Sequence, residues 1–286
     1  MLGEDPLFPS ARSKPANQKL PTTMNSEETD SVQTPFRRYG WQPDLPDQRD
    51  HLFTVPKPLA DQLPASVDLR TKCPNVLDQG QLGSCTANAL GNAHLFSQLK
   101  QPGGEDLLPS RLFIYWNERN LEGSVDSDSG AQIRDGIKVL AKLGAPPENI
   151  WPYEIANFAT KPTAKAFKVA LSHQAVTYQR VTQSLPELKG AFAVGFPVVF
   201  GFTVYESFES EAVAKSAEAP LPGPTERSFG GHAVMAVGYD DSKQVFHVMN
   251  SWGVGWGQKG FFTLPYAYLA SSDLAADFWT LRLVKE

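Results

Sequence analysis

Three short motifs, widely separated along the 286-residue chain, constrain its fold more than any other feature. Cys85 follows a turn-rich run, His232 follows two glycines, and Asn250 precedes a Ser-Trp-Gly run. A cysteine, a histidine and an asparagine can act as nucleophile, base and orienting group if the fold brings them together. Gln79, shortly before the cysteine, carries an amide that can donate to an oxyanion. The fold must therefore join two distant parts of the chain at one site.

Cys85 needs activation, because a free thiol has a pKa of about 8.5 and is mostly neutral at pH 7. Residues 86–96 predict a helix that packs closely through small side chains. Cys85 would then lie at the helix N-terminus, where free N–H groups and the macrodipole favour a thiolate. An imidazolium from His232 is the second source of activation. Because His232 follows two glycines at the start of a strand, it is expected to lie exposed at the edge of the cleft. Taken alone, Cys85 is better interpreted as a small buried apolar residue, and only its partners favour catalysis.

Together these motifs resemble the papain family of cysteine peptidases (clan CA), and within it a bacterial xylellain-like subgroup. Residues 63–70 are similar to the start of mature enzymes of this family, and the likeness continues to the C-terminus. His232 lies within, and Asn250 slightly beyond, the roughly 130–150 residues downstream of the cysteine that the family shows. The resemblance implies that Cys85 is the nucleophile, His232 the base, Asn250 its orienting group and Gln79 an oxyanion donor.

Several positions depart from the family pattern. Leu82 stands where relatives carry a cysteine, so one half of a disulfide is lost, and Thr86 replaces an aromatic residue. The run 128–132 (DSGAQ) replaces a Cys-Asn-Gly-Gly run that binds substrate backbone in relatives. By resemblance, an apolar substrate side chain is expected in a pocket with Asp277 near its floor. The residues expected to contact substrate are Gly130, Ala131, Gly201, Ala233 and Trp252.

The pattern of apolar residues predicts an α+β fold of two halves with the active site in a cleft between them. Residues 63–170 are expected to be mainly helical and to carry Cys85, with further helices at 110–120 and 132–142. Residues 171–286 are expected to be mainly β and to carry His232 and Asn250, and the resemblance implies that this half is antiparallel and β-barrel-like. The elements expected in this half are strands at 198–204, 233–239, 245–249 and 261–264, a helix at 185–194 and a long loop at 210–229.

Residues 1–62 contain nine of the 23 prolines and few aliphatic side chains, which predicts an extended, weakly ordered segment. One apolar island, residues 36–43, interrupts it. Since the segment precedes the apparent mature start, one interpretation is an inhibitory pro-segment in which Tyr39 to Trp41 cover the cleft. A solvated tail with an anchoring patch is the equally weighted alternative.

Composition narrows the class of protein. The net charge of −5 and the absence of a long basic stretch argue against nucleic acid, and no apolar run is long enough to span a membrane. No cysteine or histidine pair has metal-ligand spacing, so neither metal nor cofactor is expected. Two cysteines, with Cys73 interpreted as a free structural thiol, fit a reducing compartment or an exported protein without disulfides. The first residues do not resemble a classical signal peptide, so localisation stays open.

These observations favour a monomeric cysteine endopeptidase that acts on peptides or proteins through a thioester at Cys85. Two alternatives stay open. The same residues could serve an amidase, a deconjugating hydrolase or an acyl transferase, or the fold could be a non-catalytic binding protein.

Overall fold

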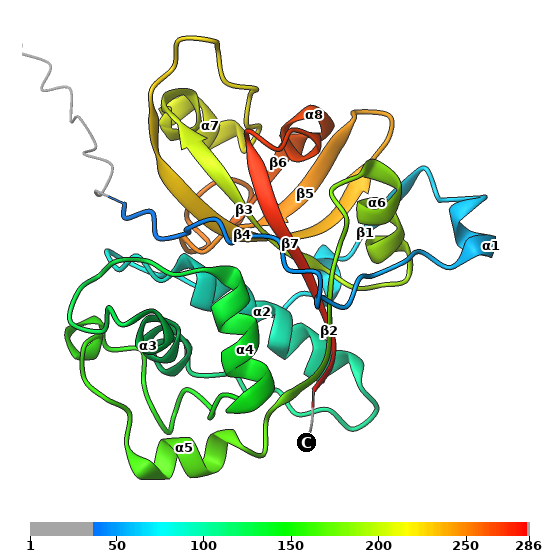
Figure 1. The fold of residues 1–286 in the computed structure, drawn as a ribbon. Helices are drawn as coiled ribbons and strands as arrows, with labels where there is room; N and C mark the ends of the chain where they lie inside the picture. Colours follow the sequence, from blue (N-terminus) through cyan, green and yellow to red (C-terminus); the bar gives the residue numbers. More distant parts are fainter. Residues whose placement is uncertain (1–36, 285–286) are drawn as a thin grey trace, which may run out of the picture. The chain divides into compact units, whose positions relative to one another are not determined.

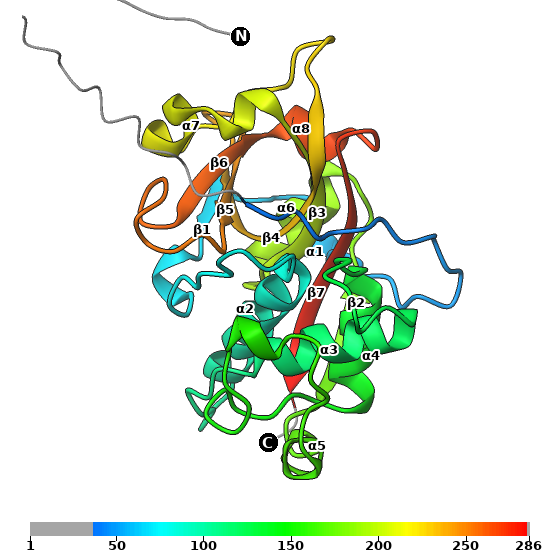
Figure 2. The ribbon, with the colours of Figure 1, turned by 90° about the vertical axis from the view of Figure 1, so that its left-hand side faces the viewer.

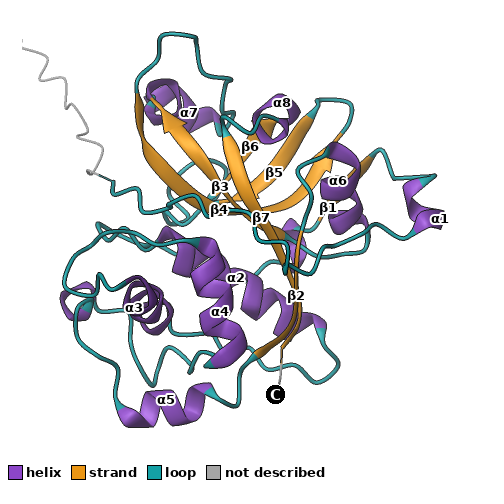
Figure 3. Cartoon of the chain, viewed as in Figure 1, coloured by secondary structure: helices purple, strands orange, loops and turns teal. Residues whose placement is uncertain are grey.

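The computed structural model describes residues 37–284; residues 1–36 and the last two residues lie outside the described part. Within residues 37–284, helices gather in one half and an antiparallel sheet forms the other (Figures 1 and 3). This mixed architecture confirms the predicted α+β fold class. Phe36, part of the apolar island, is outside the described residues.

The helical half contains α2 (Cys85–Lys100), α3 (Arg111–Glu122), α4 (Ile133–Lys142) and α5 (Ala164–Ala170). The first three agree with the sequence-based expectation to within a few residues. Ser110 begins α3 by accepting a hydrogen bond from the Phe113 N–H at 3.1 Å, and Gly123 ends it with φ of 72°. A glycine is suited to this left-handed position because it has no Cβ.

The sheet runs in the order β2-β7-β3-β4-β5-β6, with the short β1 paired to β4, and every pairing is antiparallel. It is an open sheet, so the expected barrel-like half does not close among the described residues. The strands are β1 (Ser66–Asp68), β2 (Ala175–Arg180), β3 (Val198–Tyr205), β4 (Ser228–Asp240), β5 (Val245–Met249), β6 (Phe261–Pro265) and β7 (Ala275–Val284).

Short elements connect the two halves and complete the sheet half. They are α1 (Lys57–Ala60), η1 (Arg70–Lys72), η2 (Ile155–Asn157), α6 (Leu185–Ala193), η3 (Glu206–Glu209), α7 (Glu211–Ser216) and α8 (Tyr266–Ala270). The expected loop at 210–229 is therefore only partly a loop, because α7 lies within it and β4 already begins at Ser228. β7 was not foreseen, although it lies inside the sheet between β2 and β3.

Residues 51–55 pack onto the rest of the fold rather than forming a free tail. The Phe53 N–H donates to the Arg180 carbonyl at 2.8 Å, and the Val55 N–H donates to Glu187 at 3.0 Å. Both apolar side chains are buried in the common core. The boundary after residue 62 stays a prediction. No helix among residues 37–284 is long and apolar enough to cross a membrane.

Candidate active site

Cys85 is the first residue of α2, as the sequence predicts. The preceding residue, Ser84, makes no side-chain hydrogen bond to the first N–H groups of α2. The free N–H groups of a helix lie at its N-terminus, which is where Cys85 lies. The thiol is completely buried. Helix α2 packs against β4 and β7, which places Cys85 at the junction of the two halves (Figure 2).

His232 lies on β4 and is also completely buried, whereas the sequence suggested an exposed position. Its Nε2 lies 2.8 Å from Asn250 Oδ1, and because a carbonyl oxygen only accepts, Nε2 carries the proton. The Trp252 ring stacks on the imidazole with centroids 4.9 Å apart and shields this bond from water. Nδ1 has no hydrogen-bond partner in the described structure, so it is left as the proton acceptor.

The sulfur of Cys85 lies against the strand that carries His232. The backbone N–H of Ala233, the residue after His232, donates to the sulfur. Cys85, His232 and Asn250, which lie far apart in the sequence, therefore come together where α2 meets the sheet. No hydrogen bond joins the Cys85 sulfur to His232 Nδ1 in the described structure.

Gln79 joins the same site. Its Oε1 accepts from the Ser251 hydroxyl at 2.6 Å, which orients the amide. Its Nε2 donates to the Leu82 carbonyl at 3.0 Å and to the Arg38 carbonyl at 3.2 Å. The predicted oxyanion donor thus faces a backbone carbonyl of the N-terminal part of the chain.

Residues 37–44, called here the covering segment, run between the helical half and the sheet (Figures 1 and 2). The Trp41 N–H donates to the Gly231 carbonyl at 2.8 Å, and the Ala131 N–H donates to the Gly40 carbonyl at 2.7 Å. Trp41 and Ala131 pair in parallel. The Gly40 N–H donates to the Cys85 sulfur. The segment therefore contacts both halves and the nucleophile itself.

Two glycines allow this close approach. A Cβ on Gly40 would lie 1.7 Å from the Gly83 carbonyl oxygen, and a Cβ on Gly130 would lie 2.1 Å from the Gly40 carbonyl oxygen. Gly130 also has φ of +74°, which L-residues rarely adopt. Gly130 and Ala131, expected to hold substrate backbone, hold the covering segment instead.

The side chains of the covering segment occupy the rest of the site. Tyr39 packs edge-on against the imidazole of His232, with centroids 5.9 Å apart, and the Arg37 guanidinium lies 4.2 Å above the Trp252 ring. The Trp41 indole enters a space bounded by Gly201, and its Nε1–H donates to Asp277 at 3.1 Å. Ala233 is paired with Gly201 across β3 and β4, so the expected pocket residues lie together.

Burial controls the protonation of the two reacting groups. It raises the pKa of the Cys85 thiol to about 11 and lowers the pKa of the His232 imidazole to about 4. Between these values both groups are neutral, because desolvation disfavours each charged form. The thiolate–imidazolium pair that the motifs suggest is therefore disfavoured while the covering segment is in place.

Asp128 was missed in the sequence. Its Oδ1 accepts from the Gly83 N–H at 3.0 Å and from the Tyr115 hydroxyl at 2.5 Å, and that hydroxyl accepts from the Gly130 N–H at 3.1 Å. This network ties the loop at 128–132 to the turn before Cys85. It links these two segments without a disulfide, and nothing in the sequence around Asp128 indicated it.

Glu118 explains the departure at Thr86. The hydroxyl of Thr86, the residue after the nucleophile, donates to Glu118 Oε2 at 2.9 Å. The carboxyl group is fully buried, and burial raises its pKa well above the usual value.

Glu118→Gln is expected to stabilise the protein at neutral pH. A raised folded-state pKa means that the native state keeps a proton that the unfolded state loses above about pH 4.5, so stability falls as pH rises. Gln mimics the protonated acid and removes this loss. Urea unfolding should show little difference at pH 4 and a gain on the order of 1–3 kcal/mol at pH 7. If Glu118→Gln and the parent protein were equally stable at pH 4 and at pH 7, Glu118 would be ionised in the folded protein.

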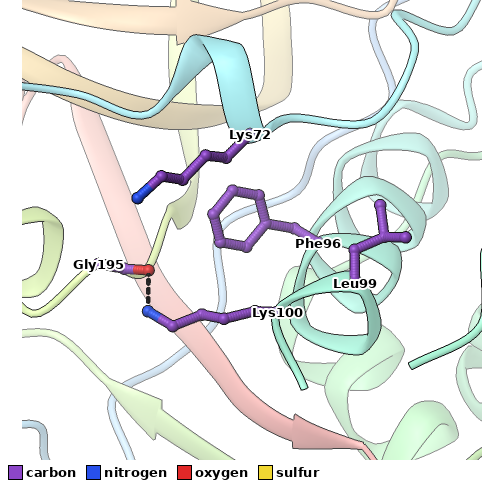
Figure 4. A pocket seen from close by; sticks show the side chains of 5 residues that line it. All are labelled: Lys72, Phe96, Leu99, Lys100 and Gly195. Carbon is purple, nitrogen blue, oxygen red and sulfur yellow. Dashed lines mark hydrogen bonds between the residues drawn. The ribbon is translucent and has the colours of Figure 1, made fainter. Parts of the chain in front are cut away.

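One hollow in the described part of the protein is separate from this site. A hollow of about 290 Å³ lined by Lys72, Phe96, Leu99, Lys100 and Gly195 lies elsewhere (Figure 4). There the Lys100 ammonium donates to the Gly195 carbonyl at 2.6 Å, just beyond α6, which is a structural contact. Within residues 37–284 no three His, Cys, Asp or Glu side chains are grouped to hold a metal ion. Cys73 and Cys85 are both free.

Comparison with known proteins identifies relatives. The papain family cysteine protease profile matches residues 63–276. Xylellain, a cysteine protease from Xylella fastidiosa, has a solved structure with a TM-score of 0.80 and 42% identity, covering 87% of this chain and 98% of that chain. An uncharacterized peptidase C1-like protein of Acanthamoeba polyphaga mimivirus is 40% identical, covering 87% of this chain and 88% of that protein.

A more distant structure supports the fold alone. Digestive procathepsin L 3 from the Tenebrio molitor larval midgut is 19% identical with a TM-score of 0.63, covering 86% of this chain and 76% of that one. The predicted family, fold and hydrolase class are confirmed, and the chain belongs to the papain family of cysteine peptidases.

Proposed function

We propose that the chain is an endopeptidase that hydrolyses peptide bonds through a thioester at Cys85. The observation that carries this proposal is that the N–H of Ala233, next to His232, donates to the Cys85 sulfur, while Asn250 orients the His232 ring and leaves its Nδ1 without a partner. Gly130, Ala131, Gly201, Ala233 and Trp252 are proposed to contact substrate, because the covering segment uses the same surface.

The reaction follows from these positions. Nδ1 of His232 takes the proton from the Cys85 thiol, and the sulfur attacks the carbonyl carbon of the scissile bond. The Gln79 amide and the backbone N–H at Cys85 stabilise the oxyanion. The imidazolium donates its proton to the leaving amine, which departs as the thioester forms. His232 then activates a water molecule, which releases the acid and returns the proton to the sulfur.

We further infer that the covering segment keeps this form inactive. Arg38 places its carbonyl oxygen on the Gln79 amide, and Gly40 directs a backbone N–H, not a carbonyl carbon, to the sulfur. A bound peptide in this position both fills the site and keeps Cys85 and His232 neutral by burial. Activity then requires that residues 37–44 move out of the site.

Labelling by a peptidyl epoxide, followed by mass spectrometry, tests the function. The expected result is one adduct on Cys85 and none on Cys73, together with cleavage of several fluorogenic dipeptide amides. Labelling without cleavage of any member of the panel would favour the amidase, deconjugating or acyl-transferase alternatives. No labelling, even after the covering segment is displaced, would favour the non-catalytic binding protein.

A further inference from the structure

The turn formed by residues 79–84 joins the two groups that would stabilise the oxyanion. The Gln79 amide lies at its start, and the backbone N–H of Cys85 follows its end. The backbone hydrogen bond inside the turn, from the Leu82 N–H to the Gln79 carbonyl, is long at 3.5 Å, and Gly80 has φ of +59°. Because a glycine loses more conformational freedom on folding than any other residue, the geometry of this turn depends on support from other segments.

Tyr153 contacts both ends of the turn through its hydroxyl group. The hydroxyl donates to the Gln79 carbonyl at 2.9 Å and lies 2.5 Å from Ser84 Oγ. Since a phenol has one proton and a carbonyl only accepts, the Ser84 hydroxyl is the donor in the second bond. Asn88 Nδ2 donates to the same Ser84 Oγ at 3.1 Å, so that oxygen has a donor as well as an acceptor. The Tyr153 hydroxyl therefore links the backbone of the first oxyanion donor to the residue before Cys85.

Arg111, on α3, holds the phenol ring and the start of the turn. Its guanidinium lies over the Tyr153 ring, 3.9 Å from the centroid, and donates to the Asp78 carbonyl at 3.1 Å and to Asn88 Oδ1 at 2.9 Å. Two hydrogen bonds to Glu148, at 2.7 and 2.8 Å, fix the plane of the guanidinium. The ring of Tyr153 is therefore held in place independently of its hydroxyl group.

We propose that Tyr153 is a positioning residue for the oxyanion site, an inference that rests on the proposed peptidase function. Its hydroxyl is bonded to Gln79 and Ser84, so it acts on the reaction through the turn and not through substrate. Burial raises the pKa of Tyr153, so the hydroxyl keeps its proton at neutral pH and continues to donate. Oxyanion donors must be aimed before the reaction, and a misplacement of about 1 Å can cost on the order of 100-fold in rate.

Tyr153→Phe, made in the full chain with Trp41→Ala to weaken binding of the covering segment, keeps the ring beside Arg111 and removes only the hydroxyl. It is expected to lower kcat for peptide amides by about 10- to 100-fold and to change KM by less than about twofold, because the donors act on the transition state. Circular dichroism and active-site titration measure the folded, competent fraction.

Tyr239→Phe is the matched control for this substitution. The Tyr239 hydroxyl also donates to a backbone carbonyl, that of Pro64, but it lies near the C-terminal end of β4, away from the turn. Its removal should leave kcat unchanged. An unchanged kcat in Tyr153→Phe, or an equal loss in both variants, would overturn the positioning role.

Two reactions of the thiol separate positioning from general damage to the site. A peptide aldehyde adds to the Cys85 sulfur, and the aldehyde oxygen takes the place of the oxyanion. Iodoacetamide forms a carbon–sulfur bond with loss of iodide and generates no oxyanion. In a Cys73→Ala background, Tyr153→Phe should weaken aldehyde binding by the same factor as kcat/KM and leave the rate and pH profile of alkylation unchanged. A shifted alkylation profile would show that the hydroxyl acts on the nucleophile itself.

Gln79→Ala tests whether Tyr153 acts through the oxyanion donors. With that amide absent, only the backbone N–H is left to position, so Tyr153→Phe should cost about threefold or less in kcat. A loss as large as in the parent background would contradict the proposal. If no peptide amide were cleaved before these substitutions, only the peptidase proposal would fail, because calorimetric binding of the aldehyde in the same four chains would still decide the role of Tyr153.

Discussion

Cys85→Ala, introduced into the full chain with Trp41→Ala, is expected to lower kcat for peptide amides by roughly a millionfold. Alanine has no group to attack the carbonyl carbon, and no other described side chain at the site replaces the sulfur. The substitution keeps a good helix former at the first position of α2, so the fold should survive. Steady-state kinetics and circular dichroism measure the two effects separately.

His232→Ala should cost about as much, and combining it with Cys85→Ala should cost no more than either change alone. This non-additivity follows because the sulfur and the imidazole act as one unit. Cys73→Ala serves as the matched control, since Cys73 donates only to the Leu69 carbonyl and lies outside the site. If the losses in kcat multiplied in the double variant, the two residues would not act as one unit. Appreciable hydrolysis by Cys85→Ala would show that Cys85 is not the nucleophile.

The sequence predicts the local features of the site well. The helix that begins at Cys85 is specified by the turn before it and by the small residues after it, and β4 is visible in its β-branched run. The motifs around Gln79 and Asn250 were likewise predicted from their resemblance to motifs of known enzymes. Each of these features depends on residues that are close together in the sequence, so a local sequence pattern is enough to predict it.

The remaining features depend on contacts between distant residues. The network of Asp128 with Gly83 and Tyr115 joins three separate segments, and nothing near Asp128 in the sequence announces it. His232 was expected to be exposed because it follows two glycines. It is buried because Trp252 and Tyr39 cover it from other parts of the chain. The neutral state of the reacting pair follows from that burial and could not be predicted from the motifs.

Trp41→Ala is expected to raise kcat/KM of the full chain by about 100-fold. Truncating a buried tryptophan removes roughly 3–5 kcal/mol of packing, and here that loss weakens only the form in which the covering segment is bound. The increase in kcat/KM reaches its limit once the covering segment is displaced in most molecules. Assays with a fluorogenic dipeptide amide measure it, and Leu45→Ala is the control because that side chain is 86% exposed.

Deleting residues 1–60, the change that the sequence alone suggests, is a poorer test of the same idea. It would also remove Phe53 and Val55 from the core, so a lower rate could reflect unfolding. The single substitution leaves those contacts intact. If the parent chain were fully active and folded Trp41→Ala protein cleaved the substrate at the same rate, inhibition by the covering segment would be refuted.

The thiol itself reports the same transition without a substrate. In the parent chain, burial holds the pKa of Cys85 near 11 and that of His232 near 4, so alkylation by iodoacetamide at pH 7 should be slow. Displacing the covering segment admits water to both groups and favours the thiolate–imidazolium pair. In a Cys73→Ala background, Trp41→Ala should therefore accelerate alkylation at neutral pH and move the onset of the pH profile to lower pH. Identical profiles in the two chains would mean that the covering segment does not control the ionisation of the nucleophile.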